Sequence, residues 1–216
     1  MTSDRTRIKV CGVTQPQQAR ELCALGVDAI GMIMLESSPR YVPVDTAIKI
    51  REAVTPFVNL VAVTVDLDPV QINDLATSIG FTTVQWHGDE PADWLGQVNL
   101  PSIKAIRPQT QSEVLTAISD YRSAQGLLLD AHVQGQYGGT GKQLDEGIWP
   151  TPLQRDSAPP LILAGGLSPE NLSEALAKTK PFAVDLNSGV EHIPGVKNLE
   201  KVRAAIEKVK EFDANR

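Results

Sequence analysis

The sequence predicts an α/β protein closed into a (β/α)8 barrel, and three observations lead to this fold class. Short apolar runs alternate with helical patterns eight times along the 216 residues. The runs are mostly continuous in Val, Ile, Leu and Ala, which is typical of parallel strands covered on both faces. The length also suits one barrel, since such barrels commonly have about 200–250 residues. We therefore expect residues 1–216 to form a single domain.

The eight apolar runs are the expected strands. An open doubly wound sheet is the alternative arrangement. The strand count, and the lack of a dinucleotide-binding fingerprint after the first strand, favour a closed TIM barrel. The runs lie at residues 8–11, 29–34, 60–65, 83–87, 103–107, 127–130, 161–164 and 183–186.

Helical periodicity fills most of the segments between these strands. Apolar residues recur at spacings of three and four around Ala19, Ile72, Leu172 and Leu199, which predicts an amphipathic helix at each place. Segment 134–160 is the exception, because it is rich in Gly, Pro and Gln and its helical pattern is short. There we expect a long loop with a reduced helix.

Capping and turn residues mark the ends of several helices. Thr14 has capping-box spacing with Gln17, and Asp68 and Ser168 each precede a proline at an expected first helical position. Three glycines fall just before a new strand, where a left-handed residue typically ends a helix: Gly26, Gly80 and Gly126.

Charge and composition exclude several classes of function. The formal net charge of −6 argues against a nucleic-acid-binding surface, which needs clustered Lys and Arg. No run approaches the roughly 20 apolar residues that span a bilayer, and residues 1–7 lack the apolar core of a secretion signal. The two cysteines have no framework spacing, which indicates a reducing compartment. We expect a cytoplasmic protein that binds neither nucleic acid nor membranes.

Chemistry in such a barrel gathers at the carboxyl ends of the strands. Position alone therefore selects a set of candidate residues, before their reactivity is considered. They are Cys11, the loop 37–40, Asp66, His87, Arg107, Asp130, Gly165, Gly166 and the turn 187–189.

Cys11 and Asp130 are the candidate catalytic residues. A thiol reacts as the thiolate, and a helix N-terminus or a nearby cation can lower the pKa of a thiol placed like Cys11. Asp130 ends a strand at the barrel mouth, where a low dielectric suits a carboxyl group to proton donation. Packing as a small hydrophobe is the alternative for Cys11, and a structural hydrogen-bond acceptor is the alternative for Asp130. Cys23 lies on an apolar helix face and is expected to pack.

Glycine-rich turns after the seventh and eighth strands predict a phosphate site. Glycine lets the backbone approach an anion closely, exposed N–H groups supply donors, and these loops habitually bind phosphate in this fold. Simple turn closure is the alternative. The expected phosphate ligands are Gly165, Gly166, Ser188 and Gly189.

Arg40 and His87 complete the candidate site. Arg40 can hold a carboxylate bidentately, with a solvated surface arginine as the alternative. His87 is either a hydrogen-bonded structural residue or an acid or base. The three histidines have no metal-binding spacing, so we expect no metal.

Short motifs spread over nearly the whole chain resemble those of the phosphoribosylanthranilate isomerase family, in the family's order. Each motif is weak alone, and together they are highly specific. They are KVCGVT at 9–14, SPRYV at 38–42, VQWHGDE at 84–90, LLDA at 128–131, GGTG at 138–141, LAGGLSPEN at 163–171, VDLNSGVE at 184–191 and PGVK at 194–197.

The resemblance implies a TIM barrel enzyme of tryptophan biosynthesis that needs neither metal nor cofactor. The family converts N-(5-phosphoribosyl)anthranilate to 1-(2-carboxyphenylamino)-1-deoxyribulose 5-phosphate by an Amadori rearrangement, the third step from chorismate. Carried to matching positions, Asp130 is the general acid and Cys11 the general base. Substrate binding then falls to Arg40, which would take the anthranilate carboxylate, to His87, and to the phosphate ligands Gly165, Gly166, Ser188 and Gly189. We expect this small molecule as the partner, and a monomer or homodimer.

Two other functions remain open. A Schiff-base aldolase of the same fold would use Lys104 or Lys9 as the nucleophile. A phosphosugar-binding protein without catalysis would need only the anion site. The presence of both Cys11 and Asp130 disfavours this last function, since binding alone needs neither.

Overall fold

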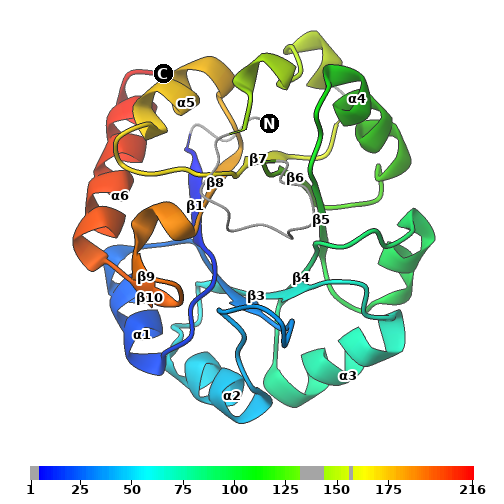
Figure 1. The fold of residues 1–216 in the computed structure, drawn as a ribbon, viewed down its shortest axis with the longest axis vertical. Helices are drawn as coiled ribbons and strands as arrows, with labels where there is room; N and C mark the ends of the chain where they lie inside the picture. Colours follow the sequence, from blue (N-terminus) through cyan, green and yellow to red (C-terminus); the bar gives the residue numbers. More distant parts are fainter. Residues whose placement is uncertain (1–4, 132–143, 156–157) are drawn as a thin grey trace.

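Residues 5–131, 144–155 and 158–216 are described by the computed structural model, and they contain a closed barrel of eight parallel strands. Strands pair in sequence order from β1 to β8, and β1 pairs with β8 to close the ring. Helices surround the strands on the outside (Figure 1). The expected (β/α)8 barrel is confirmed, and the doubly wound sheet is wrong.

All eight strands lie within one residue of their expected bounds. Their apolar runs are easy to recognise because both faces of each strand are covered. The strands are β1 (Arg7–Val10), β2 (Ala29–Ile33), β3 (Asn59–Thr64), β4 (Thr83–Trp86), β5 (Ser102–Ile106), β6 (Gly126–Leu129), β7 (Leu161–Leu163) and β8 (Ala183–Leu186).

The α-helices follow six of the strands. They are α1 (Pro16–Leu25), α2 (Val44–Ala53), α3 (Pro69–Ile79), α4 (Gln111–Asp120), α5 (Leu172–Thr179) and α6 (Leu199–Ala214). No helix in the described part of the chain is long and apolar enough to cross a membrane.

Strands β4 and β6 are followed by short 3-10 helices instead. The segment after β6 forms η2 (Glu146–Ile148) and η3 (Leu153–Arg155), which confirms the expected reduced helix. The segment after β4 forms only η1 (Ala92–Gln97), so the helical pattern expected there is wrong. Pro91 precedes η1 and Gly96 lies inside it, and both residues disfavour a longer α-helix. The GGTG motif at 138–141 lies outside the described residues.

The capping predictions hold at one helix start and fail at two. Asp68 and Gln71 form a full capping box on α3. Thr14 does not cap α1, because its hydroxyl donates to the carbonyl of Gly195 at 2.7 Å, and Gln15 takes the N-cap position. Helix α5 begins at Leu172 rather than directly after Ser168, with Asn171 at the N-cap.

Two of the three predicted helix ends are confirmed. Gly26 and Gly80 end α1 and α3 with φ of 85° and 84°, in the left-handed region that favours glycine. Gly126 was expected to end a helix, but it opens β6, and α4 ends at Asp120 with Tyr121 at the C-cap.

Apolar side chains pack on both sides of the barrel wall. Outside, residues such as Val10 belong to the main core cluster between strands and helices. Inside, Cys11 packs with Val61 and Val63. Because side chains alternate along a strand, Lys9 and Cys11 both face the barrel interior. An amine and a thiol from this part of the chain therefore lie inside the barrel.

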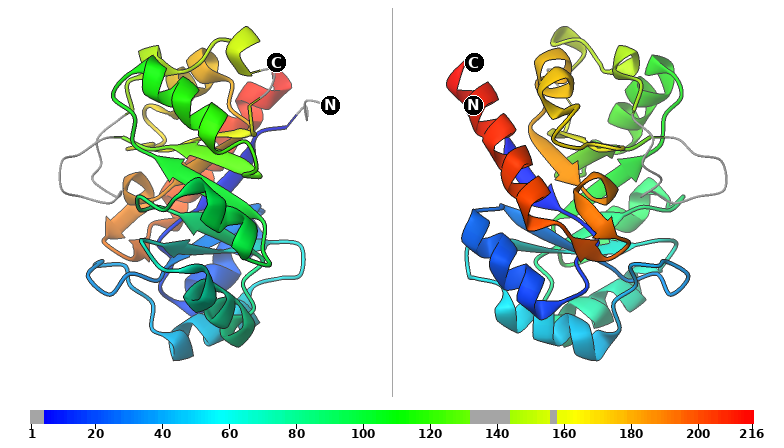
Figure 2. Two further views of the ribbon diagram at one scale, coloured as in Figure 1. Left: turned by 90° about the vertical axis from the view of Figure 1, so that its right-hand side faces the viewer. Right: turned by 60° about the vertical axis from the view of Figure 1, so that its left-hand side comes forward.

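A small hairpin lies between β8 and α6 (Figure 2). It follows the 3-10 turn η4 (Ser188–Val190) and pairs β9 (Glu191–Ile193) with β10 (Val196–Lys197) in antiparallel fashion. The Thr14–Gly195 hydrogen bond ties this hairpin to the turn before α1. The hairpin thereby brings Glu191 and Lys197 to the strand ends of β1 and β8.

Candidate active site

A cavity of about 390 Å³ opens at the carboxyl ends of the strands. All of the predicted catalytic and substrate-binding residues except Gly189 line it, and they come from six different strand ends. The lining residues that were predicted are Cys11, Arg40, His87, Asp130, Gly165, Gly166 and Ser188. Residues far apart in the sequence thus meet at one hollow, as the barrel prediction requires.

Cys11 directly follows β1 and continues its pairing with β8. Its backbone N–H donates to the carbonyl of Leu186 at 2.8 Å, which fixes the thiol at the barrel rim. Gly12 then turns the chain with φ of +70°. A methyl group at Gly12 would lie 2.8 Å from both Arg40 Cδ and Asn187 Oδ1, so this close approach requires glycine.

Charged groups surround the Cys11 thiol. Burial raises the pKa of Cys11, the Lys9 ammonium lowers it, the Asp185 carboxylate raises it further and Lys197 opposes the rise. The pKa of the thiol is raised on balance, because burial outweighs the two cations. Lys9 Nζ donates to Asp185 Oδ2 at 2.7 Å, and this pair is buried inside the barrel.

Asp130 follows β6 and faces His87 across the cavity mouth. Its Oδ1 accepts from the Ala131 N–H at 2.8 Å, and its Oδ2 lies 3.5 Å from His87 Nε2. Gln85 Nε2 lies 2.8 Å from His87 Nδ1, and a donating amide makes Nδ1 the acceptor, so this assignment places the imidazole proton on Nε2. That nitrogen is buried and has no hydrogen-bond partner among the described residues, which leaves it for a ligand.

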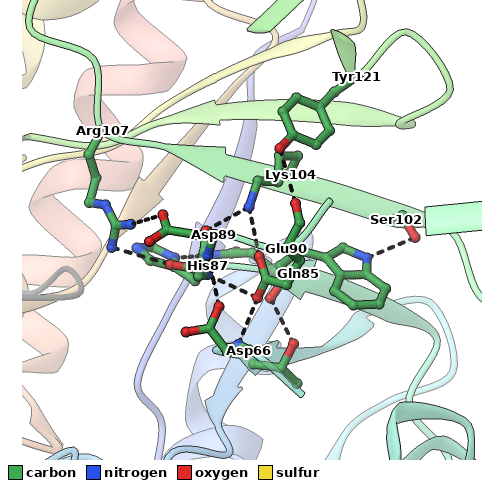
Figure 3. Close-up of polar contacts among 12 residues, drawn as sticks. Asp66, Gln85, His87, Asp89, Glu90, Ser102, Lys104, Arg107 and Tyr121 are labelled. Carbon is green, nitrogen blue, oxygen red and sulfur yellow. Dashed lines mark hydrogen bonds and ion pairs between the residues drawn. The ribbon is translucent and has the colours of Figure 1, made fainter. Parts of the chain in front are cut away.

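The loop that carries His87 is held by a buried ion pair outside the barrel wall (Figure 3). Glu90 Oε2 accepts from Lys104 Nζ at 2.7 Å, and Lys104 also donates to the carbonyl of Gly88 at 2.7 Å. Glu90 Oε1 accepts from the backbone N–H groups of Asp66 at 2.9 Å and Gly88 at 3.0 Å. Every oxygen of this carboxylate is therefore engaged.

Asp66 and Arg107 end strands but do not line the cavity. Asp66 accepts from the Asp89 N–H at 2.9 Å, and Arg107 donates to the His87 carbonyl and to Asp89 Oδ1, each at 3.3 Å (Figure 3). Both residues brace the loop after β4 from outside the cavity.

Arg40 is buried and already paired with a carboxylate of the protein. Its Nε and Nη2 donate to Glu191 Oε1 and Oε2, with the shortest distance 2.8 Å from Nη2, and Lys197 Nζ donates to Glu191 Oε1 at 2.7 Å. Burial favours the neutral acid, but Arg40 and Lys197 outweigh it and hold the pKa of Glu191 below its usual value. The solvated-arginine alternative is wrong, because Arg40 lines the cavity.

The glycine turns after β7 and β8 need glycine for two different reasons. Gly165 and Gly166 have φ of +88° and +59°, and a methyl group at Gly165 would lie 2.7 Å from the Ala131 nitrogen. A methyl group at Gly189 would collide with the carbonyl oxygen of Leu167, so this glycine lets the two turns pack together. Gly189 does not line the cavity itself, but it directly follows Ser188, which does.

The chain is similar to known proteins over nearly its whole length. A family model described as N-(5'phosphoribosyl)anthranilate (PRA) isomerase matches residues 8–208. The chain belongs to the phosphoribosylanthranilate isomerase family. The N-(5'-phosphoribosyl)anthranilate isomerase of Ralstonia nicotianae is 38% identical to it, over 99% of this chain and 96% of that protein. That of Neisseria meningitidis is 40% identical, over 94% and 95%.

Solved structures of phosphoribosylanthranilate isomerases share the fold. The enzyme from Thermotoga maritima superposes with a TM-score of 0.87 at 32% identity, over 95% of this chain and 99% of that one. A second structure, with a TM-score of 0.84 and 32% identity, is a phosphoribosylanthranilate isomerase in complex with reduced 1-(o-carboxyphenylamino)-1-deoxyribulose 5-phosphate. The sequence-based resemblance to this family is confirmed.

Several polar and charged residues in and beside the cavity were not among the site residues predicted from sequence. Asp185 and Gln85 line the cavity, while Lys9, Glu191 and Lys197 form ion pairs beside it. One signal was available for Lys9 and Asp185, because each interrupts an apolar strand, where an unpaired charge is costly. The Glu191–Lys197 pair gave no such signal, since both residues lie in a hairpin that was not expected.

The two lysines considered for a Schiff base are poorly placed for it. Lys9 and Lys104 are both buried in ion pairs at 2.7 Å, and neither lines the cavity. Cys23, the second thiol, is half-buried on α1 and packs against the core, as expected.

Proposed function

We propose that this family member isomerises N-(5-phosphoribosyl)anthranilate to 1-(2-carboxyphenylamino)-1-deoxyribulose 5-phosphate in tryptophan biosynthesis, with Asp130 as general acid and Cys11 as general base. The observation that carries the proposal is that Cys11, Asp130 and the Gly165–Gly166 turn line one cavity. An aldose-to-ketose shift needs one acid, one base and an anchor that fixes the sugar between them.

In the first step, Asp130 protonates the ribose ring oxygen. The bond from this oxygen to the sugar C1 breaks, the electron pair stays on the oxygen, and the anilino nitrogen lone pair forms a C=N bond to C1. The Asp130 carboxyl suits this transfer because Ala131 fixes one oxygen at 2.8 Å while the other faces the cavity side, near His87.

In the second step, the Cys11 thiolate takes the proton from the sugar C2. The C–H electron pair moves into the C1–C2 bond, the C=N electrons return to nitrogen, and an enolamine results. This enolamine tautomerises to the ketone. No redox partner is needed, because the proton removed from C2 and the one added at C1 balance.

Binding of the substrate's two anionic groups falls to different sides of the cavity. Gly165 and Gly166 expose backbone N–H groups for the phosphate, together with Ser188 and Gly189 of the next turn. Asn171 stiffens the first turn, because its side chain accepts from the Ser168 N–H and donates to the Gly166 carbonyl, each at 2.9 Å. Arg40 takes the anthranilate carboxylate through the edge that Glu191 does not occupy, and His87 Nε2–H supplies a further donor.

The test follows the fluorescence of freshly prepared phosphoribosylanthranilate with and without the protein. The wild-type protein is expected to consume it, while Cys11→Ala and Asp130→Ala each lower turnover by about 10²–10⁴-fold. Cys23→Ala is the matched control for thiol loss, and its turnover should stay close to wild type. Near-normal turnover of the Cys11 variant contradicts the assignment of the base. A stable borohydride adduct with a sugar phosphate would instead support the aldolase.

A further inference from the structure

Cys11 combines two properties that conflict in a base. It acts as a thiolate, yet its side chain is buried at the barrel rim, and burial raises the pKa of the thiol. A buried anion needs a counter-charge close by, because desolvation otherwise favours the neutral form. Two cations act on the thiol and could provide this counter-charge, Lys9 and Lys197.

Lys9 is placed on the same inner face of β1 as Cys11. The two residues are two positions apart, and Lys9 is the charged group that acts most strongly on the thiol. Gly31 on β2 lies against both: a methyl group there would be 2.9 Å from Cys11 Sγ and 3.2 Å from Lys9 Cε. The neighbouring strand therefore has no side chain that separates the ammonium from the sulfur.

Asp185 keeps Lys9 charged in this buried position. The register of β1 and β8 sets the two residues opposite each other, and Lys9 Nζ donates to Asp185 Oδ2 at 2.7 Å. Burial favours the neutral amine, but Asp185 and Cys11 outweigh it, and the pKa of Lys9 is raised. An ammonium has three N–H groups, so the bond to Asp185 leaves donors for the sulfur.

We infer that Lys9 is a positioning residue, which stabilises the Cys11 thiolate with an ammonium group held beside it by Asp185. The inference rests on the proposed function, in which Cys11 is the base. It assigns a role to a lysine that touches neither the cavity nor the substrate, and it makes the base a unit of two residues on one strand.

Lys197 is the competing cation, and its contacts disfavour it. Its Nζ donates to Glu191 Oε1 at 2.7 Å, to Asn187 Oδ1 at 2.9 Å and to the Asn187 carbonyl at 3.4 Å. These three acceptors match its three donors, so the sulfur would have to displace one of them. Burial also lowers the pKa of Lys197, whereas that of Lys9 is raised.

Other titratable groups surround this unit from the remaining elements. Asp130 after β6 and His87 after β4 act on Asp185, and Arg40 after β2 and Glu191 of β9 act on Lys197. These four groups influence the thiol only through Asp185 or Lys197, whereas Lys9 acts on the thiol directly. Removal of the Lys9 charge is therefore the sharpest perturbation.

The test measures thiolate formation rather than turnover. Cys23→Ala serves as the background, so that Cys11 is the only thiol, and the alkylation rate by iodoacetamide is recorded against pH alongside the ultraviolet thiolate absorbance. Lys9→Met and Lys9→Gln are expected to move the titration midpoint to higher pH by about one unit or more, which is about a tenfold slower alkylation near neutral pH. Lys9→Arg keeps the charge and should restore most of the rate.

Lys104→Met is the matched control. It removes an equally buried lysine from an ion pair of the same length, but on the other side of the barrel wall, and it should leave the Cys11 titration unchanged. Lys9→Gln keeps a donor for Asp185, so this neutral variant is expected to retain the fold, which circular dichroism checks.

An unchanged midpoint in a folded Lys9→Gln variant overturns the inference. An equal shift in Lys104→Met also overturns it, because the effect would then come from general loosening of the barrel. The proposed function fails in a different way: if the midpoint shifts as expected but Cys11→Ala keeps normal turnover, then Lys9 controls the thiol and Cys11 is not the base.

Discussion

Two buried lysine–carboxylate pairs of the same length lie on opposite sides of the barrel wall. Lys9–Asp185 lies inside the barrel and Lys104–Glu90 outside it, each at 2.7 Å. The register of β4 and β5 explains why Lys104 faces outward. Lys104 lies opposite Trp86, which packs in the outer layer with Ile72 and Leu95. The two pairs thus share distance, burial and chemistry, and differ in what surrounds them.

The two pairs differ in whether both carboxylate oxygens have hydrogen-bond partners. Both oxygens of Glu90 are taken, one by Lys104 and the other by two backbone N–H groups. Asp185 Oδ1 has no hydrogen-bond partner among the described residues, although Asp185 lines the cavity. A fully satisfied pair fixes a loop, whereas a pair with an unused acceptor and a neighbouring thiol can take part in chemistry. Environment, not the ion pair itself, separates the pair that fixes a loop from the pair that we infer to serve the thiol.

The largest effect on stability should come from breaking the outer pair. Glu90→Ala leaves Lys104 buried without a counter-charge and two N–H groups without an acceptor, so the free energy of unfolding should fall by about 3–5 kcal/mol. Urea denaturation measures this. Asp89→Ala next to it removes an exposed partner of Arg107, for which about 0–1 kcal/mol is expected. Equal losses in both variants would contradict the structural role of the outer pair.

A third buried pair, Arg40–Glu191, extends the comparison to the cavity edge. Charge-assisted hydrogen bonds contribute about 1.5–3 kcal/mol, so loss of the proposed contact of Arg40 to the substrate carboxylate in Arg40→Ala should raise KM roughly 10–100-fold. Steady-state kinetics measures KM, and Arg20→Ala on the outer surface of α1 is the control. An unaltered KM together with a lower unfolding midpoint would mean that Arg40 serves the fold alone.

A smaller effect is expected when a methyl group is added beside the inner pair. Gly31→Ala places a methyl group against Cys11 Sγ and Lys9 Cε, and such overpacking costs about 1–3 kcal/mol of stability. Turnover should fall along with it, because the thiol must shift. Gly96→Ala in η1 is the control, since a methyl group there meets no atom within 4 Å. If Gly31→Ala kept wild-type turnover, the precise placement of the sulfur would not matter.

Much of the fold could be predicted because its signals are local. Continuous Val, Ile and Leu runs mark each strand, and the residues that follow them are the ones that meet at the cavity. Asp68 predicts its own capping box because Gln71 lies three residues away. When two interacting residues are close in sequence, their spacing alone is sufficient to predict the contact.

The remaining features depend on partners that are distant in sequence. Thr14 has the spacing of a helix cap, but its hydroxyl bonds to Gly195, 181 residues away. Arg40 resembles a surface arginine until the hairpin brings Glu191 to it across 151 residues. Lys9 and Asp185 are separated by 176 residues and meet only through the pairing of β1 with β8. No local sequence pattern predicts these contacts.

The pairing of β1 with β8 also makes the thiol a reporter of barrel completion. The sulfur comes from the first strand, its counter-charge is held by the last strand, and Lys197 follows beyond it. A chain that has formed only its early strands lacks Asp185, and with it the carboxylate that holds the Lys9 ammonium in place. The charged surroundings of the thiol are therefore complete only when β1 and β8 have paired, so the titration of Cys11 distinguishes a closed ring from an open one.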